Sequence, residues 1–235
     1  MTGRRLALLG AALAAGAALA PGAARAQVGH DPARSPFVDL TYRSSVTPFA
    51  GYFFAAKDPA GVAPQSAPLF GVRYDLFLGG PASFTARVAS ATTERTVIDP
   101  ARPASRRVLG VEQRPLTLAD VGFSFALTGQ KSWHGLVPLV HGGAGLATNF
   151  SGADPGGFNL GTRFALDYGA GLRIVPSGRL AFRIDASRYA YQIRYPDRYF
   201  SPAIDSTQVL PTARSKSKWL NNSAVTFGAS YQFFR

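Results

Sequence analysis

The stretch Phe164-Ala165-Leu166-Asp167-Tyr168-Gly169-Ala170-Gly171-Leu172-Arg173-Ile174 decides the fold. Its even-numbered positions are apolar or aromatic, and its odd-numbered positions are small or charged. A repeat of two residues places these two sets on opposite faces of a β-strand. The same pattern recurs along the chain, each time with an aromatic-rich face. We therefore expect an all-β protein: an eight-stranded, antiparallel, up-and-down transmembrane barrel with lipid outside and a polar interior.

The alternation predicts eight strands. They cover residues 46–56, 68–78, 82–96, 116–128, 134–149, 159–175, 179–193 and 221–234. The connections after the second, fourth and sixth strands are short, whereas the others are long. Short turns at one end and long loops at the other are typical of outer-membrane barrels. Because the number of strands is even, both ends of the barrel chain are expected on the short-turn, periplasmic side. The facing of the first strand stays open, because aromatic residues occupy both of its faces.

The start of the chain predicts export. Residues 1–26 have the features of a secretory signal peptide: Arg4 and Arg5, an apolar run over 6–20, and the small-x-small site Ala24-Arg25-Ala26. Residues 27–45 are expected to form an irregular periplasmic N-terminal segment, and residues 46–235 the outer-membrane barrel. The chain has no cysteine, which excludes disulfides and thiolate metal sites.

One face of the predicted sheet carries charge. It holds Arg73, Asp75, Arg87, Asp120, Arg163, Asp167, Arg173, Arg183 and Asp185, all opposite the aromatic face. Nine charges are too costly for the dry core of a soluble lipocalin-like barrel, although in a soluble sandwich they could face water. An eight-stranded barrel is just wide enough for side chains to fill it. We expect a polar network that plugs the barrel, with Asp167 near Arg183 or Arg173 near Asp185.

The charge balance is strongly basic, with a formal net charge of +12. In an exported chain without a nucleic-acid motif, this balance favours contact with anionic lipid, including lipopolysaccharide phosphates. The candidate contacts lie in the long loops: Arg106, Arg107, Arg198, Arg214, Lys216 and Lys218. A receptor or adhesin surface is the alternative role of the same loops.

The last strand carries a more specific pattern. Thr226-Phe227-Gly228-Ala229-Ser230-Tyr231-Gln232-Phe233 resembles the signal that the barrel-assembly machinery reads on outer-membrane proteins, with Gly228, Tyr231 and Phe233 as its key positions. Phe234 and Arg235 follow where many barrels end. The chain from about residue 46 onward resembles the small OmpA/OmpX-like outer-membrane β-barrel proteins. The resemblance implies a Gram-negative-type outer membrane, periplasmic termini, and delivery by periplasmic chaperones. No peptidoglycan-binding domain is expected after the barrel.

The sequence favours a monomer with a structural or surface-interaction role, without cofactor or metal. Catalysis would need a placed histidine beside Ser or Asp. His30 and His134 fall outside the strands' interior face, whereas His141 points inward with Asp120 and Ser124 within possible reach. We expect a structural polar contact there rather than an enzyme. A narrow small-solute pore and a lipid-modifying enzyme remain the alternatives.

Overall fold

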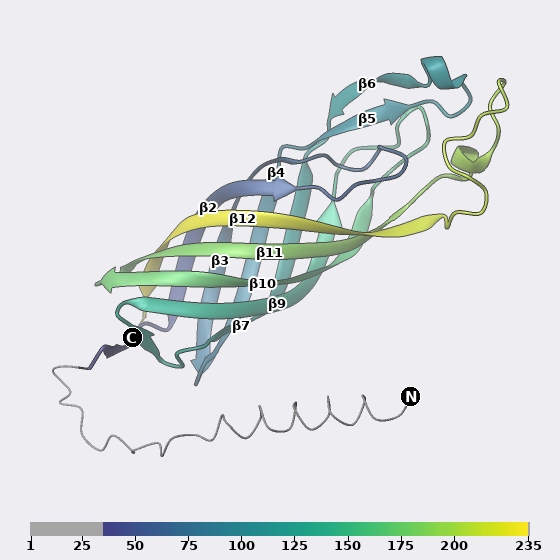
Figure 1. Cartoon of the computed structure of the whole chain (residues 1–235). Helices are drawn as coiled ribbons and strands as arrows, with labels where there is room; N and C mark the ends of the chain where they lie inside the picture. Colours follow the sequence, from purple (N-terminus) through teal and green to yellow (C-terminus); the bar gives the residue numbers. More distant parts are fainter. Residues whose placement is uncertain (1–34, 235) are drawn as a thin grey trace, which may run out of the picture. The chain divides into compact units, whose positions relative to one another are not determined.

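The protein is seen in a computed structural model that describes residues 35–234, so the predicted signal peptide lies outside the described residues. Eight long strands form a closed antiparallel barrel (Figure 1). In chain order they are β2 (Ser44–Phe54), β3 (Ala67–Gly79), β4 (Ala82–Ala91), β7 (Leu116–Ala126), β9 (Leu136–Thr148), β10 (Thr162–Ser177), β11 (Leu180–Arg194) and β12 (Ser217–Phe233). Each strand pairs with the next, and β12 pairs with β2 to close the barrel. The predicted fold class is confirmed.

The outer wall of the barrel is apolar because side chains alternate along each strand. On β3, Phe70 and Val72 point outward and are each 51% exposed, whereas Arg73 between Val72 and Tyr74 points inward and is 2% exposed. Rows of this kind match the roughly 25 Å apolar band of outer-membrane barrels. On β2, Tyr52 lies outside and Phe53 is fully buried, which resolves the facing that the sequence left open.

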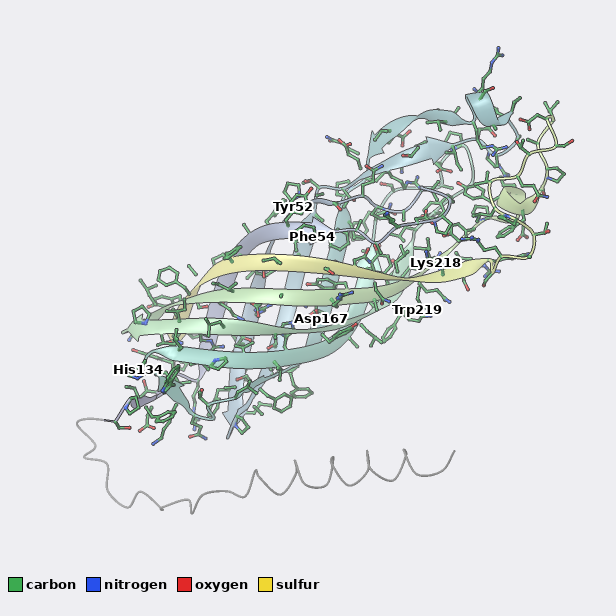
Figure 2. All side chains as sticks on the ribbon, in the orientation of Figure 1. Tyr52, Phe54, His134, Asp167, Lys218 and Trp219 are labelled. Carbon is green, nitrogen blue, oxygen red and sulfur yellow. The ribbon has the colours of Figure 1, made fainter. Side chains whose placement is uncertain are left out.

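Aromatic side chains gather near both ends of this band. Tyr52, Phe54 and Trp219 lie towards the long-loop end of the barrel, as Figure 2 shows. Towards the short-turn end, Tyr231 stacks on Phe233 with ring centroids 6.5 Å apart. Such girdles are expected at the two membrane interfaces. No helix among residues 35–234 is long and apolar enough to cross a membrane.

The third predicted strand was too long. β4 ends at Ala91, and the chain then forms a separate hairpin of β5 (Glu94–Ile98) and β6 (Val108–Gln113), with the 3-10 turn η2 (Ala104–Arg106) between them. Because both arms of this hairpin are β-strands, the alternation of side chains in the sequence continues beyond Ala91, where the chain leaves the barrel. The last strand, β12, starts at Ser217 rather than at 221. A second 3-10 turn, η3 (Asp197–Phe200), lies in the fourth long loop.

The predicted irregular segment 27–45 is more ordered than expected in its described part. β1 (Phe37–Asp39) pairs with β8 (Lys131–Trp133) in the turn between β7 and β9, and β2 already begins at Ser44. Backbone bonds continue this attachment, from His134 N to Pro36 O and from Phe77 N to Arg43 O. Residues 36–43, here called the N-terminal strap, are thus tied to the short-turn end of the barrel.

Candidate functional site

The middle of the barrel is filled by ion pairs between its strands. Arg73 on β3 reaches Asp185 on β11, with Nη1 and Oδ2 2.6 Å apart. Arg183 binds the same carboxylate at 2.9 Å and also reaches Asp75 on β3 at 3.2 Å. Gly171 faces Asp185 across the strand pair, and a Cβ at Gly171 would collide with this carboxylate. The small residue on β10 therefore makes room for the ion pair.

A second group of ion pairs is built around Arg87 on β4. Its guanidinium holds Asp120 on β7 at 3.0 Å and Asp167 on β10 at 2.7 Å. The same guanidinium lies over the ring of Tyr189, 5.0 Å from its centroid. Arg87 is 3% exposed, so this cation depends on its two carboxylates and the ring for stabilisation.

The interior side chains predicted from the sequence come together, but in other pairs. Asp167 binds Arg87 rather than Arg183, and Arg173 lies 3.8 Å from Asp75 rather than beside Asp185. Arg173 and Arg183 are direct cross-strand partners and carry like charges. Both side chains therefore extend to a carboxylate on another strand, Asp75 of β3. Among residues 35–234, Arg163 has no acidic partner and lies half-buried near the loop end of β10.

His141 on β9 lies inside this network. Its Nε2 is 3.0 Å from Ser187 Oγ, and its ring nitrogens are 3.8 Å and 3.7 Å from Asp167 and Asp185. Ser124 is its cross-strand partner on β7, as the sequence placed it, but the hydroxyl it contacts is that of Ser187. The described residues hold no cluster of acids and histidines suited to a metal. The surroundings of His141 are those of a structural contact.

At the long-loop end of the barrel, the interior is largely apolar, contrary to the prediction of a polar interior. Towards the long loops, the inward side chains are apolar or aromatic and under 2% exposed: Phe53, Leu69, Leu116, Leu118, Tyr191 and Leu220. They belong to one hydrophobic cluster that continues into the loops. Most of the polar interior therefore lies in the middle and at the short-turn end of the barrel, and Asn222 is a buried polar side chain at the long-loop end.

The four long loops pack together over this end, and we call residues 57–66, 92–115, 149–161 and 195–216 the loop cap (Figure 1). Its buried side chains come from every loop: Val62, Ile98, Phe158, Tyr199 and Leu210. The sequence analysis predicted long loops here and did not predict this core. Isolated apolar residues within the loops were the available signal.

Two aspartates, the half-buried Asp58 and the buried Asp154, hold the loop cap together. Asp58 accepts the backbone N–H groups of Val62 and Ala63 at 2.7 and 2.9 Å, and also the hydroxyl of Tyr195 from the fourth loop. Asp154 accepts the N–H of Phe158 at 2.8 Å. Each carboxylate thus stabilises the backbone of its own loop and contacts another loop.

The second of these contacts is an ion pair. Arg95 of β5 reaches Asp154 at 3.2 Å, with the two side chains 1% and 0% exposed. The Arg95 guanidinium lies 4.9 Å from the centre of the Phe158 ring. Burial, together with the hydrogen bond to Asp58, raises the pKa of the Tyr195 phenol above its usual range.

The six predicted loop cations have different surroundings. Arg107 donates to Thr207 at 2.5 Å and Arg198 to Pro155 O at 3.5 Å, so these two link one loop to another. Lys218 lies at the start of β12 and donates to Lys57 O of the first loop at 3.0 Å. Lys216 pairs with the exposed Asp197 at 2.7 Å, which lowers the pKa of that carboxyl.

The other two of the six, Arg106 and Arg214, are exposed, and Arg106 lies in η2 at the tip of the β5–β6 hairpin. One cation, Arg188, was missed by the sequence analysis as a candidate contact, whereas Arg194 was assigned to the basic fourth loop. Arg188 and Arg194 lie on the outward face of β11, beyond Phe182 and Ile184, and both are exposed. Continuing the alternation past Ala186 was the signal that could have found Arg188.

The predicted assembly signal lies on the strand that closes the barrel. Tyr231 pairs in register with Val46 of β2, and its hydroxyl lies 3.2 Å from Arg179 Nη1. Gly228 points inward, where a Cβ would lie 2.7 Å from Thr47 Cγ2 and 3.0 Å from Phe49 Cβ. Gly228 therefore also has a packing role inside the barrel.

A closed antiparallel barrel with an apolar outer wall, aromatic ends and an ion-paired interior defines an integral protein of the outer membrane. A model of the family described as Outer membrane protein beta-barrel domain matches residues 6–233, and the chain belongs to this family. No curated protein matches the sequence.

Solved structures with a similar fold are outer-membrane proteins. Neisserial surface protein A is 13% identical, with a TM-score of 0.47, over 85% of this chain and 98% of that chain. The outer membrane protein AlkL, determined in DMPC lipid bilayers, is 15% identical, with a TM-score of 0.47, over 88% and 97%. OprG from Pseudomonas aeruginosa is 11% identical, with a TM-score of 0.46, over 83% and 98%.

Proposed function

We propose that this protein is a surface-interaction barrel, which presents the loop cap outside the cell and binds anionic lipid around its base. One observation supports the lipid contact: along the outward face of β11, apolar side chains are followed by basic side chains towards the loops. Leu180, Phe182 and Ile184 form the apolar part of this face. Arg188 and Arg194 follow towards the loops, and both are exposed.

The arrangement fits the headgroup region of the outer leaflet. Trp219 lies on the same outward face of neighbouring β12, paired in register with Gln192, and is 48% exposed. Figure 2 shows Trp219 at the loop end of the barrel. Trp marks the boundary between acyl chains and headgroups. Arg194 lies just beyond the level of Trp219, whereas Arg188 lies before it, level with Phe54 of β2, from where its long side chain can extend to the headgroups. Arginine binds phosphate groups with two donors.

The fourth loop adds to this positive charge. Residues 195–216 carry three basic and two acidic side chains. Arg198, Arg214 and Lys216 are exposed in this loop. In a Gram-negative-type outer membrane, the anionic ligand is the phosphate of lipopolysaccharide. Attraction of this kind weakens as salt screens it.

The test compares the removal of positive charge at two heights of the molecule. The double variant Arg188→Gln/Arg194→Gln removes the charges at the boundary, and Arg106→Gln removes a charge at the hairpin tip. Both proteins are refolded in nanodiscs with and without lipopolysaccharide, and their thermal unfolding is followed. We expect lipopolysaccharide to raise the unfolding temperature of the unchanged protein and of Arg106→Gln, but much less that of the double variant. Equal stabilisation of all three proteins contradicts the proposal.

The filled interior argues against the narrow-pore alternative. Arg73, Arg87 and Arg183 are each at most 3% exposed and hold their carboxylates across the middle of the barrel. We expect no stable discrete conductance from the protein in planar bilayers, and a reproducible single-channel current would contradict this. For a lipid-modifying enzyme, the His141 ring lies in the wrong place, because it is enclosed by the strands away from lipid.

The partners of assembly are proposed on the last strand. β12 supplies Gly228, Tyr231 and Phe233 in the spacing that the barrel-assembly machinery reads, after delivery by periplasmic chaperones. The closed barrel leaves no long free strand edge for pairing with another copy, which supports a monomer. No part of the proposal involves nucleic acid.

A further inference from the structure

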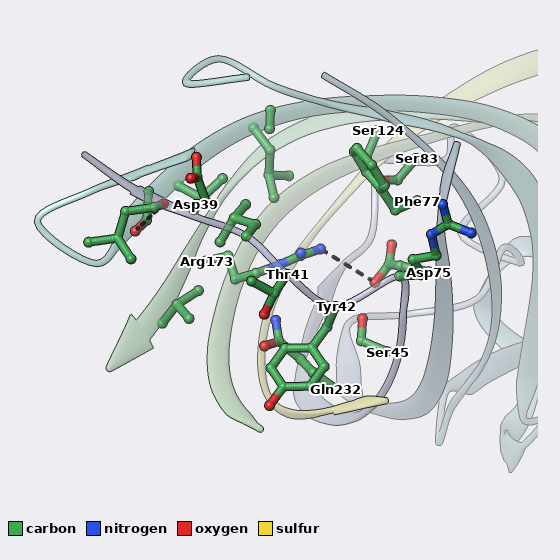
Figure 3. A pocket seen from close by; sticks show the side chains of 18 of the residues that line it. Asp39, Thr41, Tyr42, Ser45, Asp75, Phe77, Ser83, Ser124, Arg173 and Gln232 are labelled. Carbon is green, nitrogen blue, oxygen red and sulfur yellow. Dashed lines mark hydrogen bonds and ion pairs between the residues drawn. The ribbon is translucent and has the colours of Figure 1, made fainter. Parts of the chain in front are cut away.

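We propose that the short-turn end of the barrel holds a binding site for a small amphipathic anion, of the class of medium-chain alkyl carboxylates. A cavity of about 400 Å³ lies there, between the ion-paired middle of the barrel and the N-terminal strap. Figure 3 shows its wall, with Arg173 and Asp75 facing one another and Thr41 and Tyr42 of the strap close by. The proposal is separate from the surface-interaction function.

The size of the cavity suits a small ligand. Small-molecule sites have volumes of about 300–1,000 Å³. A volume of 400 Å³ holds about a dozen water-sized groups, at roughly 30 Å³ each. Residues 38–43 of the strap line the cavity together with turn residues such as Pro81, Gly129 and Gly178. The cavity is therefore bounded on the periplasmic side by short segments and not by the barrel wall.

The wall of the cavity has two chemical characters. Its apolar part includes Phe77, Val137, Leu139 and Val175, whose side chains would meet an alkyl chain. Val137 and Leu139 lie at the start of β9, 1% and 3% exposed, so they add a rigid surface. Burying such a chain is worth about 0.8 kcal/mol for each methylene group.

The polar part of the wall is rich in hydrogen-bond donors. Ser45, Ser124 and Gln232 line the cavity beside Arg173 and are each at most 5% exposed. Hydroxyl, amide and guanidinium groups can all donate to one anionic headgroup. A ligand with an anionic head and an apolar tail therefore matches both parts of the wall.

The ion-pair group that includes Arg173 has more arginines than carboxylates, whereas the group around Arg87, whose ion-paired residues do not line the cavity, has the opposite excess. Arg73, Arg173 and Arg183 share only two carboxylates, Asp75 and Asp185, within their ion-pair group. The group thus carries one excess positive charge.

Arg173 is the least tightly held of these three arginines. It lies 3.8 Å from Asp75, whereas Arg183 reaches the same carboxylate at 3.2 Å. The Arg173 side chain is 15% exposed, and its buried Nε has no hydrogen-bond partner among residues 35–234. A buried donor without a partner costs free energy, and a carboxylate head placed against Arg173 removes this cost.

The experiment separates binding in the cavity from partitioning into lipid. The protein is refolded in nanodiscs with labelled Val and Leu methyl groups and titrated with octanoate while NMR spectra are recorded. The methyls of Val137, Leu139 and Val175 report the cavity, and those of the lipid-facing Val121 and Leu146 report the bilayer. We expect saturable shifts at the cavity methyls. Shifts at the lipid-facing methyls alone, or equal shifts at both sets, overturn the proposal.

Two variants test the role of the charge. Arg173→Met should weaken octanoate binding about tenfold or more, as expected for the loss of a hydrogen bond to a charged group. It should leave the weaker binding of uncharged octanol unchanged, and Arg173→Lys should retain most of the octanoate affinity. Heat-modifiable gel mobility verifies that both variants fold. Equal octanoate affinity in Arg173→Met, or tighter binding of octyltrimethylammonium than of octanoate, overturns the assignment of an anion.

Discussion

The middle of the barrel and the loop cap both bury charged side chains, but the charges meet different needs. In the middle, strand pairing already satisfies the backbone, and Asp185 binds the side chains of Arg73 and Arg183. In the loop cap, no continuous sheet is present, and Asp58 instead accepts N–H groups of its own loop. Carboxylates fill space between strands in one region and replace a hydrogen-bond ladder in the other.

This difference predicts how far a local change spreads. The ion pairs of the middle join strands that are distant in the chain: Arg73 and Asp185 are 112 positions apart. Loss of such a pair affects the whole barrel, because the strands unfold together. Asp154 and Arg95 join two loops only, so their loss should open the loop cap while the barrel below stays folded.

The largest effect is expected in the middle of the barrel. Asp185→Asn leaves Arg73 and Arg183 buried with one full carboxylate fewer, and breaking a buried pair costs about 3–5 kcal/mol. We expect the denaturant midpoint of the whole barrel to fall, as measured by the heat-modifiable mobility of the folded protein.

The matched control removes an exposed carboxylate instead. Asp197 pairs with Lys216 at 2.7 Å, but the two side chains are 81% and 58% exposed. Asp197→Asn should change the stability by less than about 0.5 kcal/mol, because exposed ion pairs contribute little. If Asp185→Asn and Asp197→Asn had the same midpoint, the interior pairs would not hold the barrel together.

A smaller and local effect is expected in the loop cap. Arg95→Met leaves Asp154 buried without its cation, at a cost near the lower end of the same range, about 3 kcal/mol. We expect trypsin to cleave the loops faster while the unfolding midpoint of the barrel stays unchanged. The double variant Arg95→Met/Asp154→Asn removes both charges and keeps the acceptor for Phe158 N–H, so it should recover resistance. A fall in the barrel midpoint in Arg95→Met would show that the loop cap and the barrel unfold as one unit.

The same contrast explains what the sequence could predict. Alternation places a residue on a face, so the inward direction of Arg183 and Asp185 follows from Phe182 and Ile184 beside them. It says nothing about partners, which depend on barrel closure and on which strands face one another across the interior. For this reason the predicted pairing of Asp167 with Arg183 was wrong. Asp167 pairs with Arg87 of β4 instead.

The loop cap could not be predicted because its residues follow no period. Val62, Phe158 and Leu210 lie in apolar stretches of one or two residues within the loops, and they become a core only when the four loops meet. Asp58 and Asp154 look like ordinary turn residues in the sequence. Their cross-links to Tyr195 and Arg95 join loops that are far apart along the chain.

The smallest expected effect is a change with pH in the stability of the loop cap, separate from the stability of the barrel. Burial raises the pKa of the Tyr195 and Tyr199 phenols above the ordinary value of about 10. A raised pKa in the folded state means that the neutral phenols stabilise the loop cap fully below pH 10, and that this stability is lost as the pH rises further. Because the chain has no cysteine, a dye can be attached at Phe150→Cys, an 87% exposed position in the third loop.

The anisotropy of this dye during guanidinium unfolding should report opening of the loop cap at a lower denaturant concentration at pH 11 than at pH 9. Tyr195→Phe keeps the ring but removes one of the two ionisable groups. It should lower the stability of the loop cap at pH 9, because Asp58 loses a donor, and should reduce the difference between the two pH values. An unchanged pH difference in Tyr195→Phe would mean that the phenol bound to Asp58 does not control the loop cap, and that the alkaline loss arises in the barrel itself.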